Sequence, residues 1–424
     1  MRVPMPRESD PARETAERIA RESYGKLVAF LAARMRDVAE AEDALSDAFA
    51  AGLTDWGRNG VPKNPEGWLI TAARRRMVDA YRSRRTAADS VIHLQLMHEE
   101  LTETAFRDLP MPDERLSLMF ACAHPAIERS IRAPLILQTV LGFDAATIAS
   151  AFLISPATMS QRLVRAKSKI KEAGIPFRVP EREEIGERLE SVLDAIYTTF
   201  SEGWTDAAGT DVKRRDLAEE GIWLGRLLVQ AMPNEPEALG LLALMLYAEG
   251  RRGARRDEHG DYVPLSAQDP AQWDNAMIDE AEELLSRASG MGTTGRYQLE
   301  AAVQSAHVVR RASGRSDWTA IAAIYDALFA ITGSPVVAIN RAVAIAEARG
   351  PTEALYALDE LSGEDCLADY EPYWAARAGL LARIGEVALA DEAYERAIGL
   401  ESDPAVRKFL EKRRADLRKA ISPH

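Results

Sequence analysis

The stretch TIASAFLISPATMSQRLVRAKSKIK, residues 147–171, decides the fold that we expect for this part of the chain. Ser155 is a good helix N-cap, and Pro156 falls at the first helical position, where its missing N–H costs nothing. Apolar residues then recur on one face of the following helix, at Met159, Leu163, Ala166 and Ile170. Two short helices, a tight turn and a second helix with a polar, basic outer face predict a helix-turn-helix.

The outer face of this second helix predicts contact with duplex DNA. Five cations lie between Arg162 and Lys171 with no acid among them, although the whole chain carries a net charge of −13. In the major groove Arg reads guanine edges, Gln reads adenine, and the remaining cations hold phosphates. The alternative is a solvated amphipathic helix with a cationic face, which the capped turn makes less favoured.

Charge and composition bound the class of protein. Residues 1–180 hold 26 Lys and Arg against 23 Asp and Glu, whereas residues 181–424 hold 27 against 43. The first part is therefore mildly basic and the second strongly acidic, so only the first is expected to meet nucleic acid. No secretory signal or membrane-length apolar run is visible, and Cys122 and Cys366 stand far apart. These features predict a cytoplasmic location and no disulfide scaffold.

A second basic helix is predicted over residues 64–85, NPEGWLITAARRRMVDAYRSRR. Six arginines and one acid lie between Arg74 and Arg85, and Trp68 begins the helix after a loop rich in Gly, Pro and Asn. A basic helix beside aromatics and a flexible loop can hold single-stranded DNA through backbone charge and base capture. Taken alone, this pattern is better explained by a solvated face over a core that holds the aromatics.

Taken together, the two helices resemble the extracytoplasmic-function (ECF) sigma factors of bacterial RNA polymerase. AEAEDALSDAFAAGLTDW at 39–56 is similar to their region 2.2, and GWLITAARRRMVDAYRSRR at 67–85 is similar to regions 2.3 and 2.4. Arg75 stands where Asn is common in that pattern. The resemblance implies an all-α fold with a region 2 helical bundle over 10–85, a linker over 86–111, and a region 4 helix-turn-helix over 112–175.

The resemblance also implies the partners and the site residues. Region 2 is expected to bind the clamp helices of core RNA polymerase and to open the −10 element, and region 4 to bind the −35 element and the β flap. The expected −35 contacts are Thr158, Ser160, Gln161, Arg162, Val164 and Arg165, with Thr158 and Arg162 as phosphate contacts. The expected −10 contacts are Trp68, Arg74, Arg75, Arg76, Asp79 and Arg82. The expected polymerase contacts are Asp43, Asp47 and Phe49.

The remaining residues, 181–424, are predicted to form a C-terminal helical extension. YEPYWAARAGLLARIGEVALADEAYERAIGLESDP at 370–404 resembles a tetratricopeptide repeat, and Gly314, Gly350 and Gly385 are spaced by 36 and 35 residues. A long loop at 249–272 is expected to interrupt the repeats. The whole chain resembles the ECF subgroup with a fused tetratricopeptide-like extension, which implies that the extension regulates the sigma region and has a protein partner of its own.

No catalytic or cofactor motif is visible in the chain. His93 and His98, near Glu99 and Glu100, lack a second ligand cluster, so we expect neither a metal nor a cofactor, and no enzymatic activity. Two other classes stay open. One is a helix-turn-helix regulator with a repeat-type sensor that binds duplex DNA without replacing sigma; the other is an enzyme with an unrecognised helical site.

Overall fold

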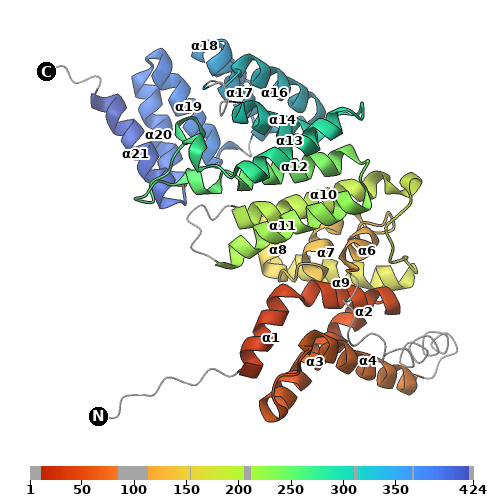
Figure 1. The fold of residues 1–424 in the computed structure, drawn as a ribbon. Helices are drawn as coiled ribbons and strands as arrows, with labels where there is room; N and C mark the ends of the chain where they lie inside the picture. Colours follow the sequence, from red (N-terminus) through yellow and green to blue (C-terminus); the bar gives the residue numbers. More distant parts are fainter. Residues whose placement is uncertain are drawn as a thin grey trace, which may run out of the picture. The chain divides into compact units, whose positions relative to one another are not determined.

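The computed structural model describes residues 11–84, 113–152, 154–204, 212–309, 314, 316–364 and 367–419. Within these ranges the regular structure is helical, as predicted, and the only pairing of extended backbone is an isolated bridge between Arg256 and Tyr262 (Figure 1). The chain forms two compact units, Met1–Ile196 and Tyr197–His424. The predicted linker, 86–111, lies outside the described residues.

The first unit begins with a bundle of four helices: α1 (Pro11–Glu22), α2 (Tyr24–Met35), α3 (Val38–Asn59) and α4 (Pro65–Arg84). Helix α3 packs against the other three, and it starts where the Asp37 side chain accepts a hydrogen bond from the Glu40 backbone N–H at 3.1 Å. The largest side chains in the bundle core are fully buried: Ile19, Leu27, Leu31, Leu45, Leu69 and Met77. This core is large enough to fix the exposed faces of α3 and α4 in place.

A second group of helices in the same unit consists of α6 (Arg115–Cys122), α7 (Arg129–Thr139), α8 (Ala145–Ala151) and α9 (Pro156–Glu172). Helix α8 packs on α9, and α7 packs on both of them. The segment predicted to form the helix-turn-helix, 147–171, falls on α8 and α9. Leu153, in the turn, lies outside the described residues.

The two groups of helices pack directly on each other. Helix α2 contacts α6 and α7, and α3 contacts α9. Gly25 of α2 marks the closest approach, because a Cβ built on it would lie 1.7 Å from the carbonyl oxygen of Val140. Only a residue without a side chain allows the backbones to come this close.

Helix α10 (Arg182–Trp204) spans the boundary between the units, which falls at Ile196. Its first part belongs to the first unit, where Leu189, Val192 and Leu193 are buried. Two ion pairs tie this part to α7: Arg129 with Glu190 at 2.7 Å, and Arg132 with Glu187 at 3.4 Å. Residues 182–196 are thus part of the first unit, whereas the C-terminal extension was predicted to begin at 181.

The second unit is a succession of packed helices. They are α11 (Val212–Ala231), α12 (Pro236–Glu249), α13 (Asn275–Ser289), α14 (Arg296–Val308), α16 (Trp318–Thr332), α17 (Pro335–Ala348), α18 (Pro351–Asp359), α19 (Glu371–Ile384), α20 (Val387–Leu400) and α21 (Pro404–Lys419). Most of these helices pack mainly on their neighbours in sequence, whereas α14 packs mainly on α12. The pair α17 and α18 starts at 335 and 351, and the pair α19 and α20 starts at 371 and 387, which is a repeat of 36 residues.

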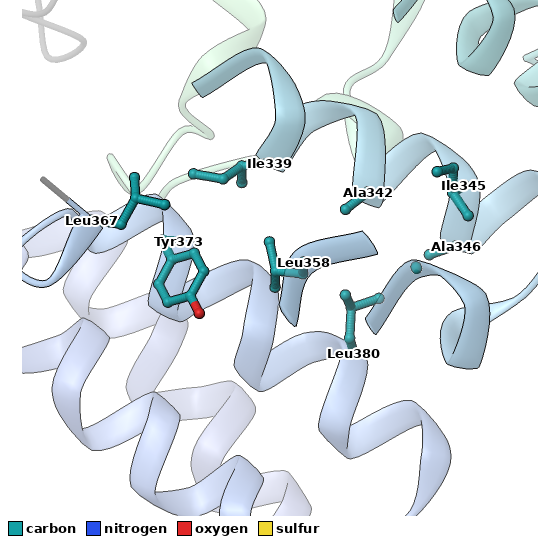
Figure 2. Packing of buried hydrophobic residues seen from close by; sticks show 9 residues of the cluster. Ile339, Ala342, Ile345, Ala346, Leu358, Leu367, Tyr373 and Leu380 are labelled. Atoms are coloured by element: carbon teal, nitrogen blue, oxygen red, sulfur yellow. The ribbon is translucent and has the colours of Figure 1, made fainter. Parts of the chain in front are cut away.

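The apolar cores of this unit lie between consecutive helix pairs. Figure 2 shows one of them, in which Ile339 and Ile345 of α17, Leu358 of α18, and Tyr373 and Leu380 of α19 converge. The next core contains Ala378, Leu381, Ala390, Tyr394 and Ala397, five of the residues that carried the resemblance to a tetratricopeptide repeat. Small residues at these positions let the paired helices approach closely.

The loop between α12 and α13 folds against the last helix of the chain. It contains three short 3₁₀ turns: Arg252–Arg255, Leu265–Ala267 and Pro270–Gln272. Lys408 of α21 bonds both carboxylate oxygens of Asp261 at 2.6 and 2.8 Å, and the rings of Tyr262 and Phe409 meet edge-to-face with centroids 5.5 Å apart. Arg256 pairs with Asp403 just before α21. This loop therefore joins the beginning of the array to its end.

Candidate nucleic-acid interface

The start of α9 is fixed by the residues that predicted it. The Ser155 hydroxyl accepts a hydrogen bond from the Thr158 backbone N–H at 3.2 Å, and Pro156 opens the helix. The apolar stripe is buried as expected, with Met159, Leu163 and Ile170 each no more than 1% exposed. Burial of this stripe determines which face of α9 points to solvent.

The six residues predicted to contact the −35 element all lie on exposed positions: Thr158, Ser160, Gln161, Arg162, Val164 and Arg165. Val164 is 62% exposed, the second largest exposure among the large apolar side chains of the described residues. An exposed valine flanked by Gln161 and Arg165 offers donors, an acceptor and an apolar contact on one helical surface. This is the set of groups that distinguishes base pairs in the major groove.

Two of the five cations of α9 have acidic partners within the protein. The Lys167 ammonium lies 2.6 Å from a Glu42 carboxylate oxygen, and the Lys171 ammonium lies 2.6 Å from Asp37 and 4.0 Å from Glu40. The cations of this helix that do not read bases were predicted to hold phosphates. In the structure Lys167 and Lys171 instead pair with acids in or next to α3, although Lys171 stays exposed, as do Arg162, Arg165 and Lys169.

Helix α4 presents only some of its predicted −10 contacts to solvent. Arg75 and Arg76 are exposed, and Arg76 lies 3.3 Å from Asp47. Trp68 is half-buried, and its ring meets that of Trp56 edge-to-face with centroids 5.5 Å apart. Trp68 therefore packs against Trp56 while it stays partly exposed.

The other predicted −10 residues are Arg74, Asp79 and Arg82. The guanidinium of Arg74 lies 5.4 Å from the centre of the Phe30 ring, within the range of a cation–π contact. The side chains of Asp79 and Arg82 lie outside those that the structure describes. Among the described side chains of α4, the exposed arginines are Arg75 and Arg76, near the middle of the helix.

Helix α3 carries the predicted polymerase contacts. Asp43 and Asp47 are exposed, and Phe49 is half-buried. Sequence reasoning missed Leu53, which is 46% exposed on the same helix. An apolar residue in an amphipathic helix is read as core by default, and only the three-dimensional position of Leu53 shows that it faces solvent.

The described residues do not show a site for metal or nucleophilic chemistry. They contain no group of three or more His, Cys, Asp or Glu that could hold a metal ion, and His93 and His98 lie outside them. Burial raises the pKa of the Cys122 thiol to about 12, which keeps it protonated and unreactive. Among the described helices, none is both long and apolar enough to cross a bilayer.

Comparisons with known proteins agree with the N-terminal part of this site. Residues 19–87 match Sigma-70 region 2, a family of non-enzymatic transcription initiation factors, and this match supports a sigma-factor-like role with RNA polymerase. Residues 188–289 match DUF6596, a family of unknown function. The uncharacterized protein R00370 of Rhizobium meliloti (strain 1021) is 37% identical over 379 residues, which cover 88% of this chain and 89% of that protein. No solved structure matches the chain.

Proposed function

We propose that this chain, which belongs to the same family as the Rhizobium meliloti protein and carries Sigma-70 region 2, is an ECF-type sigma factor. It directs core RNA polymerase to specific promoters and has no catalytic activity of its own. The observation that carries this proposal is the exposed reading surface of α9, in the same compact unit as the residues that match region 2. A regulator that binds duplex DNA alone has no need of that region.

In this proposal α9 enters the major groove of the −35 element. Gln161, Val164 and Arg165 read base edges together with Ser160, while Thr158 and Arg162 hold phosphates. The N-terminus of α9 is suited to this role, because the free N–H groups and the helix dipole favour a nearby phosphate. The exposure of these side chains on a rigid, capped helix supports the assignment.

The −10 element and the polymerase meet the other group of helices. Arg75 and Arg76 of α4 contact the opened −10 strand, with the free edge of Trp68 beside them. Core polymerase binds α3 through Asp43 and Asp47, with Leu53 as an apolar contact. The clamp helices and the β flap are the parts of polymerase that the ECF resemblance implies.

The C-terminal unit regulates the sigma region and presents a surface for a protein partner. The 36-residue repeat of its last two helix pairs supports the tetratricopeptide-like assignment for that part. Its role is tested by comparing the full chain with a chain that ends after 204. A cut at 180 would remove Leu189, Val192 and Leu193 from the core of the first unit and would confuse misfolding with regulation.

The decisive experiment is promoter-specific transcription with purified core polymerase that lacks other sigma factors. The full chain is expected to start transcripts at defined promoters selected from a random library. Arg165→Ala is expected to change the −35 sequence that is selected, whereas Ser168→Ala, on the same exposed helix, is the control. Absence of core binding and of specific initiation by the wild-type chain would refute the proposal and would favour a regulator that acts without replacing sigma.

A further inference from the structure

One stripe of α9 continues from the proposed base readers into the two lysines that contact α3. Ser160, Val164, Lys167 and Lys171 follow each other at spacings of four, three and four residues, so they share one side of the helix. The first two are exposed, but the last two meet α3. The same side of the recognition helix therefore has exposed side chains in its first half and lysines paired with acids in its second, of which Lys167 is shielded and Lys171 is exposed.

These acids are three side chains at the start of α3: Asp37, Glu40 and Glu42, here called the carboxylate cluster. The Lys167–Glu42 pair is largely shielded, with side chains 12% and 18% exposed. Lys171 is more open, but the side chain of its partner Asp37 is only 8% exposed. Burial raises the pKa of Glu42 and the charge of Lys167 opposes this rise, which shows how closely the two groups interact.

The carboxylate cluster is arranged so that it can release the lysines. Asp37 also caps α3 by accepting a hydrogen bond from the Glu40 backbone N–H, so it keeps a partner without Lys171. Asp37 caps α3 and Glu40 lies in its first turn, where the helix dipole stabilises negative charge. A partly buried ion pair of this kind adds little net stability, because desolvation offsets most of the attraction. Its arrangement therefore calls for another explanation.

We propose that the carboxylate cluster is an internal substitute for DNA phosphates, which holds Lys167 and Lys171 of the recognition helix until DNA takes them over. Carboxylate and phosphate oxygens accept the same short, charge-assisted hydrogen bonds from an ammonium group. Lys167 and Lys171 continue the stripe of Ser160 and Val164, so DNA lying along that stripe reaches them next. The identity of the DNA as a promoter rests on the proposed function, but the exchange of carboxylate for phosphate does not.

The position of the carboxylate cluster also connects this exchange to polymerase binding. Glu42 is adjacent in sequence to Asp43, one of the residues proposed to bind polymerase. A partner that covers Asp43 and Asp47 comes within one residue of the Lys167–Glu42 pair. Core polymerase is therefore expected to loosen the contact between α3 and α9, so that the two groups of helices can reach separate promoter elements.

The test removes the charges of Asp37 and Glu42 in the full chain without changing the size of either side chain. Asp37→Asn with Glu42→Gln keeps the helix cap and the side-chain volumes, but removes the two charges that hold the lysines. Glu17→Gln with Glu22→Gln on α1 makes the same change in net charge at exposed positions, where Glu17 pairs with Arg13 and Glu22 with Arg18. The two double variants therefore differ in where the charge is lost.

Two measurements distinguish the variants. The first is the affinity for a duplex oligonucleotide of random sequence as a function of salt. The wild type must break two ion pairs before Lys167 and Lys171 bind phosphates, so Asp37→Asn with Glu42→Gln is expected to bind the duplex about tenfold more tightly, with about the same slope of log K against log salt. The second is hydrogen exchange in residues 165–172, which is expected to become several times faster in Asp37→Asn with Glu42→Gln, because α9 loses two of its contacts with α3.

The outcomes separate this inference from the proposed function. An affinity equal to that of the wild type, or no duplex binding by Asp37→Asn with Glu42→Gln at any salt, would overturn the inference. The same holds if the control variant behaves like the test variant. If the wild-type chain binds core polymerase and residues 165–172 keep their full protection in the complex, polymerase does not loosen the contact. A failure to bind core polymerase at all would instead refute the sigma-factor proposal and leave the duplex experiment to decide the exchange.

Discussion

Replacing Gly25 by alanine should separate the two groups of helices in the first unit. A Cβ at this position would meet the carbonyl oxygen of Val140 at 1.7 Å and its carbonyl carbon at 2.7 Å. Real Cβ contacts begin beyond 3.0 Å, and backbone atoms cannot turn aside as a flexible side chain can. Helix α2 must therefore move away from the end of α7, or the bundle must deform.

The expected cost follows from two opposing effects. Alanine favours the helical backbone over glycine by about 1 kcal/mol. Overpacking a tight contact costs about 1–3 kcal/mol, and more where backbone must shift, so we expect a net destabilisation of about 2 kcal/mol at Gly25. Gly57→Ala in α3 is the matched control, because nothing lies within 4 Å of its Cβ. That variant should be stabilised by about 1 kcal/mol.

Hydrogen exchange of the full chain is the appropriate assay, because a protein with two compact units need not unfold in a single step. In Gly25→Ala the amides of α2 and α7 should exchange roughly thirtyfold faster, which corresponds to about 2 kcal/mol at a factor of ten per 1.4 kcal/mol. Gly57→Ala should leave them as slow as in the wild type or slower. Equal exchange in the two variants would show that the close approach of α2 and α7 does not hold this unit together.

Three further predictions concern the site and the second unit. Arg165→Ala should change the −35 base preference at a cost of about 1–3 kcal/mol, whereas Arg162→Ala should weaken all sequences alike; affinities for a panel of −35 variants separate the two. Asp43→Lys with Asp47→Lys should weaken binding to core polymerase in a pull-down while circular dichroism stays unchanged, and undiminished binding would remove α3 from the interface. Burial next to Glu401 raises the pKa of Glu371 to about 7, so the folded unit should lose stability as pH rises from 4.5 to 7. Glu371→Gln should therefore leave stability unchanged at pH 4 and raise it by about 1–2 kcal/mol at pH 8, and equal melting shifts at the two pH values would contradict this.

Local features of the site could be predicted from sequence because each depends on residues close in the chain. The cap at Ser155 and the buried stripe of α9 need only the helical period and the chemistry of a few side chains. The same reasoning predicts which residues of α9 face solvent. Exposure of Gln161 and Arg165 therefore follows from the pattern, although it does not by itself prove their role.

Features that depend on distant residues could not be predicted in this way. Lys167 and Glu42 are 125 positions apart, and a periodic pattern shows the face of a lysine but not its partner. Trp68 is half-buried because Trp56 of α3 lies beside it, which the aromatic spacing alone does not show. The first part of α10 reads like any amphipathic helix, and only its packing on α7 assigns it to the first unit.

The loop between α12 and α13 changes how the second unit should unfold. In an open solenoid each repeat contacts only its neighbours, so stability is nearly a sum of local terms and the ends fray first. Here Asp261 bonds Lys408 across 147 residues of chain, and Tyr262 packs on Phe409. Fraying of α21 then requires the loop to detach as well, so the last helix is coupled to the first part of the array. A linear array folds fast through local contacts. Because this long-range contact closes a large loop, we expect the unit to fold more slowly and more cooperatively, so that loss of α21 destabilises α12 as well.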